Sequence, residues 1–326
     1  MSVEIVTVRK GDGDQRLDRW FKAHYPALGF GKLQKLLRTG QIRVNGGRVK
    51  PAHRIAAGDE IRVPPLGDTE KAAPEKKAAP RLSDKDVALI RGMVIHEDDA
   101  LYVLNKPSGL AVQGGSKTGK HVDGMLGALN PRGEKPKLVH RIDRDTSGLL
   151  VIAKTAAAAR VLTQSFKSRD AKKLYWAVTV GVPDQMGGEI DAALAKRGGA
   201  GQERVEVVDR DHPMGKPART EFQVMDRAGN KAAFVALSPL TGRTHQLRVH
   251  LALLGTPIQG DGKYGERATF LAGIAPSLHL HARALDIKHP DGGRLQITAP
   301  LEGAMAETFR FFDFDSTAPD PFKDEL

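Results

Sequence analysis

The densest group of reactive side chains in this sequence lies directly before an apolar run that predicts a β-strand. The group is His140-Arg141-Ile142-Asp143-Arg144-Asp145-Thr146-Ser147-Gly148. Loops held by rigid strands often carry catalytic residues, and an arginine beside a carboxylate keeps that carboxylate ionised. Such a carboxylate can act as a nucleophile, a general base or a metal ligand. The residues alone leave these roles open, together with a purely structural turn at the entry to the strand.

A second group of polar side chains falls within residues 239–250. We expect a helix here that opens at Thr244 and closes at Gly255, and its buried stripe consists of Leu247, Leu251 and Leu254. Backbone N–H groups at the first turn of a helix favour anions. The side chains gathered at that turn are Arg243, His245, Gln246 and Arg248. This composition favours a carboxylate or phosphate partner over a surface helix with solvated arginines.

The histidines do not show the spacing of a metal-binding motif. His245 and His250 are five residues apart, about 140° around a helix, so their rings do not converge on one ion. His279 and His281 can share a strand face, but no third ligand accompanies them at motif spacing. A site assembled from histidines distant in the sequence stays open. The chain also lacks a Walker loop and a G-x-G-x-x-G motif, so we expect neither a metal nor a nucleotide cofactor.

The elements that must position these groups indicate an α+β domain. Short apolar or alternating runs predict strands at 101–105, 149–153, 174–180, 219–225, 233–238 and 295–298. Helical patterns occur near 155–167, 244–254 and 302–311. Because few of the strands are separated by helices, we expect a mostly antiparallel sheet and not a doubly wound parallel one.

The first 65 residues predict a separate helix–helix–strand unit with a basic surface. Asp14 can cap a first helix, and a second helix, about residues 31–39, places basic side chains opposite its apolar stripe. An Asn-Gly pair then predicts a hairpin turn. The basic side chains of the second helix and the hairpin are Lys32, Lys35, Arg38, Arg43 and Arg48. Their arrangement suits a surface that follows nucleic-acid phosphates, although charged runs are commonly just solvated faces.

The distribution of charge supports a polyanionic partner. The formal net charge of the 326-residue chain is +11, and residues 1–65 carry 13 Lys and Arg against 6 Asp and Glu. The absence of cysteine excludes disulfides and thiolate chemistry. No signal-like apolar segment or run of 18 apolar residues occurs, so we expect a cytoplasmic protein without a membrane partner.

Composition also predicts the domain boundaries. Residues 66–82 are rich in alanine, proline and charge without periodicity, which is typical of a flexible linker. We therefore divide the chain into a basic module at 1–65, a linker at 66–82, an α+β domain at 83–316 and a charged tail at 317–326.

Two stretches of the chain resemble known families. The first unit resembles an S4 domain, a small RNA-binding module, over RLDRWF…LQKLLRTGQIRVNGGRVKPAHRIAAGDEIRV. Residues 93–300 resemble the RluA/RluC-type pseudouridine synthases in five blocks whose order and spacing agree. The blocks are NKPSGLAVQGG, HRIDRDTSGLLVIAK, KLYWAVTVG, SPLTGRTHQLRVHLALLGTPIQGDGKYG and LHLHARAL. Two positions depart from the family pattern, with Gln113 where histidine is frequent and Ile142 where leucine is usual.

The resemblance implies roles for particular residues. Asp143, the first aspartate of the HRIDRD block, is the implied nucleophile, and Arg248 is implied to pair with it. Tyr175 is implied to stack on or hydrogen-bond the target base, and Leu280 to lie beneath that base. The implied RNA contacts of this domain are Arg141, which fills the gap left in the RNA stack, His140 and Arg243.

The implied fold is an S4 module followed by a mostly antiparallel, mixed-sheet pseudouridine synthase domain. The implied activity isomerises uridines in RNA, and the chain most resembles enzymes that act on large-subunit ribosomal RNA. Because the reaction has no redox change and needs no energy source, no cofactor is expected. We expect a monomer that binds ribosomal RNA. Two alternatives remain, an RNA-binding or ribosome-assembly protein that has lost activity and a metal-dependent RNA hydrolase.

Overall fold

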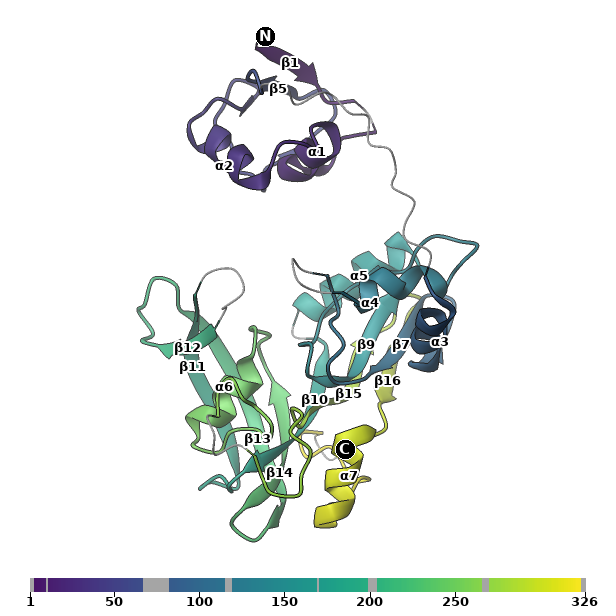
Figure 1. The fold of residues 1–326 in the computed structure, drawn as a ribbon, viewed down its shortest axis with the longest axis vertical. Helices are drawn as coiled ribbons and strands as arrows, with labels where there is room; N and C mark the ends of the chain where they lie inside the picture. Colours follow the sequence, from purple (N-terminus) through teal and green to yellow (C-terminus); the bar gives the residue numbers. More distant parts are fainter. Residues whose placement is uncertain are drawn as a thin grey trace. The chain divides into compact units, whose positions relative to one another are not determined.

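The computed structural model describes residues 3–9, 11–66, 82–114, 119–168, 170–198, 204–265 and 270–323. The chain divides into two compact units, Met1–Arg81 and Leu82–Leu326 (Figure 1). Most of the predicted linker, residues 67–81, lies outside the described residues. Each unit is a separate body with its own hydrophobic core.

The first unit packs two helices against short strands. Helix α1 spans Leu17–His24 and α2 spans Phe30–Arg38, so the two predicted helices are confirmed. The strands are β1 (Glu4–Thr7), β2 (Gln15–Arg16), β3 (Arg43–Val44), β4 (Arg54–Ile55) and β5 (Glu60–Val63). They form an antiparallel sheet in the order β1-β5-β3 and a separate β2–β4 pair. The apolar faces of both helices are buried, with Trp20, Phe21 and Leu33 among the core residues.

The structure tests two local predictions for this unit, the Asp14 helix cap and the Asn-Gly turn. Asp14 does not cap α1, because Arg16 occupies the N-cap position and makes no side-chain capping bond. The Asp14 carboxylate instead accepts a hydrogen bond from Arg54. The predicted hairpin turn is confirmed, since Asn45 and Gly46 both have positive φ and lie between the paired Val44 and Gly47.

The second unit contains one large mixed sheet in the order β12-β11-β13-β14-β10-β15-β9-β7-β6 (Figure 1). Two further strands extend it, because β16 pairs with β15 and β8 pairs with β9. The described strand pairs are antiparallel except for β9 and β15, so the predicted mostly antiparallel sheet is confirmed. The strands are β6 (Val94–Glu97), β7 (Leu101–Lys106), β8 (Lys137–Leu138), β9 (Ser147–Ala153), β10 (Lys172–Val180), β11 (Gly187–Arg197), β12 (Arg204–Val208), β13 (Lys216–Ala228), β14 (Ala232–Pro239), β15 (Leu280–Lys288) and β16 (Arg294–Thr298).

Helices cover different parts of this sheet. The helices are α3 (Asp84–Gly92), α4 (Val122–Met125), the 3₁₀ helix η1 (Leu126–Ala128), α5 (Ala156–Lys167), α6 (Gln246–Leu253) and α7 (Gly303–Phe312). Helix α5 packs against β9 and β15, whereas α6 packs against β11, β12 and β13 (Figure 1). Side chains fix two helix starts, since Ser83 forms a capping box with Asp86 and Thr155 accepts the N–H of Ala158.

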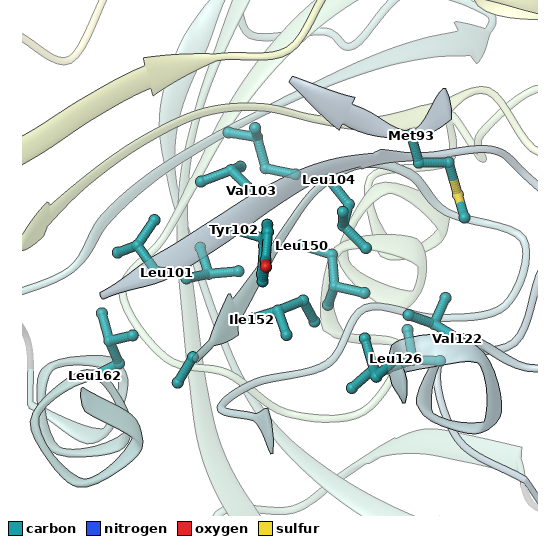
Figure 2. Packing of buried hydrophobic residues seen from close by; sticks show 14 of the residues in the cluster. Met93, Leu101, Tyr102, Val103, Leu104, Val122, Leu126, Leu150, Ile152 and Leu162 are labelled. Atoms are coloured by element: carbon teal, nitrogen blue, oxygen red, sulfur yellow. The ribbon is translucent and has the colours of Figure 1, made fainter. Parts of the chain in front are cut away.

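The core at one end of the sheet surrounds β7 and β9. Every residue of β7 is buried, and so is β9 from Gly148 onward, which explains why both strands are continuous apolar runs in the sequence. Figure 2 shows the β7 side chains beside Leu150 and Ile152 of β9, with Leu162 of α5 and Val122 and Leu126 packed around them. The loop that precedes β9 is therefore attached to a strand that is buried from Gly148 onward.

A close contact joins the two halves of the sheet. Strands β9 and β15 pair in parallel over only two positions, Ser147 with His281 and Gly148 with Ala282. Gly148 has a φ of 101°, and a Cβ at this position would lie 2.3 Å from the carbonyl oxygen of Ala282. Only glycine fits both the backbone conformation and the approach of the two strands. This contact places the loop before β9 next to the start of β15.

The C-terminal segment packs against the middle of the sheet. Phe309 of α7 contacts Trp176 of β10 and Phe234 of β14 in an aromatic cluster. Beyond α7, Ala318 and Phe322 also pack on this cluster, so the packed chain continues past residue 316 as far as the described residues extend. In the described part of the chain, no helix is long and apolar enough to cross a membrane.

Candidate active site

A cavity of about 320 Å³ lies where four segments of the second unit meet. These segments are the loop before β9, strand β10, the start of α6 and the start of β15. The cavity lining includes Asp143, Tyr175, His245, Arg248 and Leu280. The resemblance assigned roles to four of these five residues, namely Asp143, Tyr175, Arg248 and Leu280, which are far apart in the chain.

Asp143 faces two nitrogen donors across the cavity. Its Oδ2 lies 3.9 Å from Nη1 of Arg248 and 3.9 Å from Nε2 of His245, and its side chain is 25% exposed. These distances are too long for hydrogen bonds, but they place the Arg248 charge beside the carboxylate. Asp145, the other aspartate of the loop, forms an ion pair with Arg144 and does not line the cavity. The two aspartates of the loop, two residues apart in the sequence, therefore have different surroundings.

Arg248 is held mainly by a residue that the sequence did not single out. It is buried and makes two hydrogen bonds to Asp261, at 2.8 Å and 2.7 Å. Burial alone would lower the pKa of Arg248, but these bonds to Asp261 outweigh burial and raise it. Asp261 also accepts the backbone N–H groups of Lys263 and Tyr264. The expected pairing of Arg248 with Asp143 is thus a longer contact, and Asp261 is the hydrogen-bonded partner.

Tyr175 and Leu280 provide apolar surface within the cavity. Tyr175 of β10 is half-buried and Leu280 of β15 is buried, on two strands that pair directly. Burial raises the pKa of Tyr175 above its ordinary value, and the nearby charge of Asp143 adds to this effect. The phenol is therefore neutral at pH 7, so it can stack on a planar ring and offer its O–H as a donor.

Lys106 anchors the loop that carries Asp143. The side chain is completely buried at the end of β7, and its Nζ donates to the carbonyl oxygens of Pro107, Leu110 and Arg144. Burial lowers the pKa of Lys106 to about 8, while Asp145 and Asp143 act in the opposite direction. Sequence reasoning quoted this lysine only within the NKPSG block. A lone charge at the end of an apolar strand was the available signal for such an anchor.

His140 has a positioning contact in this structure. Its Nε2 accepts the backbone N–H of Val151 at 2.8 Å, and its ring stacks on Phe166 with centroids 4.0 Å apart. Burial lowers the pKa of His140 to about 3, and the charge of Lys173 adds to this effect, so the ring is neutral at pH 7. A neutral ring fixed against β9 orients the loop, and the RNA contact expected of His140 stays a prediction.

The remaining predicted contacts are exposed basic side chains. Arg141 and Arg243 line the cavity, and Arg243 donates to the carbonyl of Pro217. Lys173, which the sequence did not single out, also lines the cavity, and burial lowers its pKa. The predicted RNA contacts of the first unit lie on or beside α2, namely Lys32, Lys35, Arg38, Arg43 and Arg48. Lys35 and Arg38 line a surface hollow of that unit together with Lys50.

His281 in β15 and His279 just before this strand both make hydrogen bonds. His279 contacts the Ser277 carbonyl and the Thr308 hydroxyl, and His281 contacts the Ser147 hydroxyl. Within the ranges that the structure describes, no group of three or more His, Asp or Glu side chains could hold a metal ion.

Comparison with known proteins identifies relatives along almost the whole chain. Residues 100–253 match the family described as RNA pseudouridylate synthase. "Ribosomal large subunit pseudouridine synthase C" from Escherichia coli K12 is 38% identical over 310 residues, which cover 93% of this chain and 95% of the relative. The protein of the same name from Vibrio cholerae is 37% identical over 312 residues, which cover 94% of this chain and 95% of that relative.

Solved structures give the same assignment. Human RNA Pseudouridylate Synthase Domain Containing 4 has a TM-score of 0.59 and 28% identity, with 70% of this chain and 97% of that chain covered. Human RNA Pseudouridylate Synthase Domain Containing 1 has a TM-score of 0.54 and 26% identity, with 70% and 96% covered. The chain therefore belongs to the RNA pseudouridylate synthase family, whose members isomerise uridines in RNA.

Proposed function

We propose that this protein converts uridines of large-subunit ribosomal RNA to pseudouridine, with Asp143 as the catalytic carboxylate. The observation that carries the proposal is the convergence of Asp143, Arg248 and Tyr175 on one cavity from three separate elements. The choice of RNA is supported by relatives that are 37–38% identical over nearly the full chain and are named for the large ribosomal subunit.

The geometry suits the bond changes of the reaction. The N1–C1′ bond of uridine breaks, the uracil turns, and a C5–C1′ bond forms, while C5 loses a proton and N1 gains one. An ionised Asp143 can attack the ribose or the uracil, or remove a ribose proton. When it attacks the ribose, it also stabilises positive charge near the anomeric carbon, as glycosidase carboxylates do. Arg248 lies 3.9 Å from the carboxylate, and Tyr175 and Leu280 offer the surface on which uracil can stack.

The target base must leave its stack to reach this cavity. Extruding a base costs roughly a few kcal/mol. Stacking on Tyr175 offsets part of that cost. We propose that Arg141, which is exposed at the cavity, occupies the space that the base leaves in the RNA. The reaction changes no oxidation state, so the chemistry assigned to Asp143 requires no cofactor.

We further propose that the first unit is an S4 domain that binds RNA phosphates through the basic side chains on and beside α2. The charge of residues 1–65, with 13 Lys and Arg against 6 Asp and Glu, supports this role. We propose that the protein works in the cytoplasm as a monomer, since catalytic, stacking and RNA-binding groups are all present within one chain.

An assay of tritium release from RNA labelled at uridine C5 tests the proposal, because isomerisation frees that hydrogen. Asp143→Asn should lower the rate by roughly 10⁴-fold or more, as loss of a nucleophile does in other enzymes, without loss of RNA binding. Asp145→Asn is the matched control and should retain most of the activity, because Asp145 does not line the cavity. Full activity of Asp143→Asn would refute the mechanism.

Two additions to this assay separate the alternatives. With EDTA present, isomerisation should continue, whereas a metal-dependent hydrolase would stop and an inactive RNA-binding protein would show no release at all. With separate large-subunit, small-subunit and transfer RNAs as substrates, we expect release from the large-subunit RNA. Release from transfer RNA alone would overturn the proposed substrate while leaving the reaction in place.

A further inference from the structure

His245 has a backbone conformation that calls for an explanation. The sequence places the start of the helix at Thr244, but in the structure His245 is the N-cap of α6, with φ 54° and ψ 18°. This left-handed region is disfavoured for residues other than glycine. Of the four non-glycine residues with positive φ in the described ranges, only His245 lines the cavity. Strained backbone of this kind is often retained at functional sites.

The conformation directs the imidazole between two groups. Nδ1 lies 2.7 Å from the hydroxyl oxygen of Tyr264, and Nε2 lies 3.9 Å from Oδ2 of Asp143. The side chain is only 16% exposed. The ring therefore has one nitrogen held by a hydrogen bond and the other directed at the carboxylate.

Tyr264 determines which ring nitrogen carries the proton. The Tyr264 oxygen accepts the backbone N–H of Val205 at 3.1 Å, and we assign its own O–H as the donor to Nδ1 of His245, 2.7 Å away. Burial raises the pKa of Tyr264, which keeps that O–H protonated. When Nδ1 accepts, a neutral imidazole carries its hydrogen on Nε2, on the side of Asp143.

The charges around His245 favour the neutral ring near pH 7. Burial has the largest effect and lowers the pKa of His245, with Arg248 and Lys263 acting in the same direction. Asp143 and Asp261 act in the opposite direction. The ring is therefore uncharged near pH 7.

We propose that His245 is a positioning residue for Asp143, and that Tyr264 fixes its tautomer. This inference rests on the proposed function. Nε2 of His245 and Nη1 of Arg248 lie at the same 3.9 Å from the same oxygen, Oδ2. Hydrogen bonds of a catalytic group are often long in the free enzyme and shorten when substrate binds. The two donors then hold Oδ2, and Oδ1 is left to face the reacting carbon.

The pH dependence follows from this arrangement. When His245 is protonated, it forms a full ion pair with Asp143, which makes the carboxylate less available for reaction. Activity of the wild-type protein should therefore fall as the pH drops, with a midpoint below the ordinary histidine value of about 6.5. His245→Asn tolerates the left-handed backbone but lacks a titrating ring. It should lower kcat by about 10- to 100-fold through misplacement of Asp143. KM should be unchanged. The fall of activity at low pH that is due to His245, called here the acid limb of the pH–rate profile, should be absent.

Tyr264→Phe provides the opposite change. It keeps the ring that lies under the Arg248 guanidinium but removes the O–H that stabilises neutral His245. The pKa of His245 should therefore rise, and the acid limb should move to higher pH. The matched control is Tyr102→Phe, which also removes one hydroxyl hydrogen bond, to the carbonyl of Leu129, away from the cavity. Its kcat and pH profile should match those of the wild type.

The outcomes can be distinguished in one set of pH–rate measurements that includes Asp143→Asn. If His245→Asn keeps the wild-type kcat, or loses kcat with the acid limb unchanged, His245 is only a helix cap and the inference is wrong. An unshifted limb in Tyr264→Phe would refute the role of Tyr264 in setting the tautomer. An inactive Asp143→Asn beside a fully active His245→Asn overturns only this inference, whereas an active Asp143→Asn overturns the proposed function.

Discussion

At the scale of single residues, the position of Arg248 depends on Asp261. The Asp261 carboxylate has no exposed surface and provides both hydrogen bonds to the guanidinium. Asp261→Asn should lower the free energy of unfolding by about 3 kcal/mol, because it leaves a buried charge without its counter-charge. It should also lower kcat, since Arg248 is no longer fixed beside Asp143. Urea unfolding monitored together with tritium release checks both effects.

The control for Asp261→Asn is an exposed pair of similar geometry. Arg219 makes two hydrogen bonds to Glu189 at the surface, so Glu189→Gln should change the free energy of unfolding by less than about 1 kcal/mol. If both variants lost the same free energy of unfolding, burial of the Asp261–Arg248 pair would not make it more important for stability than an exposed pair.

His250 should make the protein less stable in acid. It is fully buried in α6, neither ring nitrogen has a hydrogen-bond partner in the described structure, and burial lowers its pKa to about 4 against the opposing effect of Asp191. The unfolded chain binds a proton on this histidine near pH 6.5, whereas the folded chain does not. Stability is therefore lost as the pH falls from about 6.5 to 4, by up to ~3 kcal/mol.

Replacement of His250 tests this sign. His250→Leu should remove its part of the pH dependence, so the variant should gain stability relative to the wild type when urea unfolding is moved from pH 7 to pH 5. Some dependence of the unfolding free energy on pH should remain in this variant, because burial also lowers the pKa of His140 and His281. Parallel curves for variant and wild type would show that His250 is not the group that titrates.

The sequence could supply the residues of the cavity but not all of their contacts. Asp143, Tyr175, Arg248 and Leu280 lie in blocks whose residue types and order are recognisable, and all four line the cavity. Asp261 lies in a quoted block as well, yet its contact with Arg248 depends on a turn of the chain that spacing does not reveal. In the same way, the left-handed backbone of His245 is a product of tertiary structure.

At the scale of elements, the approach of β9 to β15 depends on Gly148. Gly148→Ala places a Cβ among backbone atoms of Ala282, which cannot move aside as a flexible side chain can, and it also forces alanine into a positive φ. We expect the strands to separate and activity to fall by at least about 100-fold, because the Asp143 loop shifts by roughly an ångström. Thermal melting should show a clear loss of stability.

A glycine without such contacts is the control for Gly148. A Cβ at Gly92, the last residue of α3, meets no atom within 4 Å. Gly92→Ala should leave the melting temperature and activity unchanged or slightly raise stability, since alanine favours helix. If Gly148→Ala had the melting temperature and activity expected of Gly92→Ala, β9 and β15 could move apart at Gly148 without loss of function, and the prediction would be wrong.

The elements missed by sequence reasoning have identifiable causes. Residues 187–197 form the long strand β11, yet their alanines, glycines and charges have low strand propensity. Pairing with β13 on one side and β12 on the other makes them a strand. Strand β13 is also longer than the predicted 219–225, because its ladder with β14 continues to Ala228. Such tertiary pairing is not visible in local patterns.

At the scale of the whole molecule, the first unit should contribute affinity and not chemistry. Replacing Lys32, Lys35 and Arg38 together with glutamine should weaken RNA binding and leave kcat at saturating RNA unchanged. Each lost phosphate contact should reduce the slope of log affinity against log salt by about 0.7 to 0.9. A salt titration of RNA binding gives this slope directly.

The control removes equal charge from the surface of the second unit. Arg227, Lys231 and Lys288 are exposed and do not line the cavity, so their replacement with glutamine should leave the slope nearly unchanged. If both triple variants reduced the slope equally, the affinity would follow net charge and not the surface of α2. Composition alone predicted the basic first unit, because its excess charge can be counted without any structure.

The short parallel contact between β9 and β15 also governs how the protein reaches its native state. It joins Ser147 and His281, which are 134 residues apart in the chain. Closing so long a loop loses chain entropy before the contact is made, so such pairings form slowly and late in folding. Asp143 precedes β9, whereas Leu280 begins β15. The cavity that contains both residues is therefore complete only when this long-range pairing has formed.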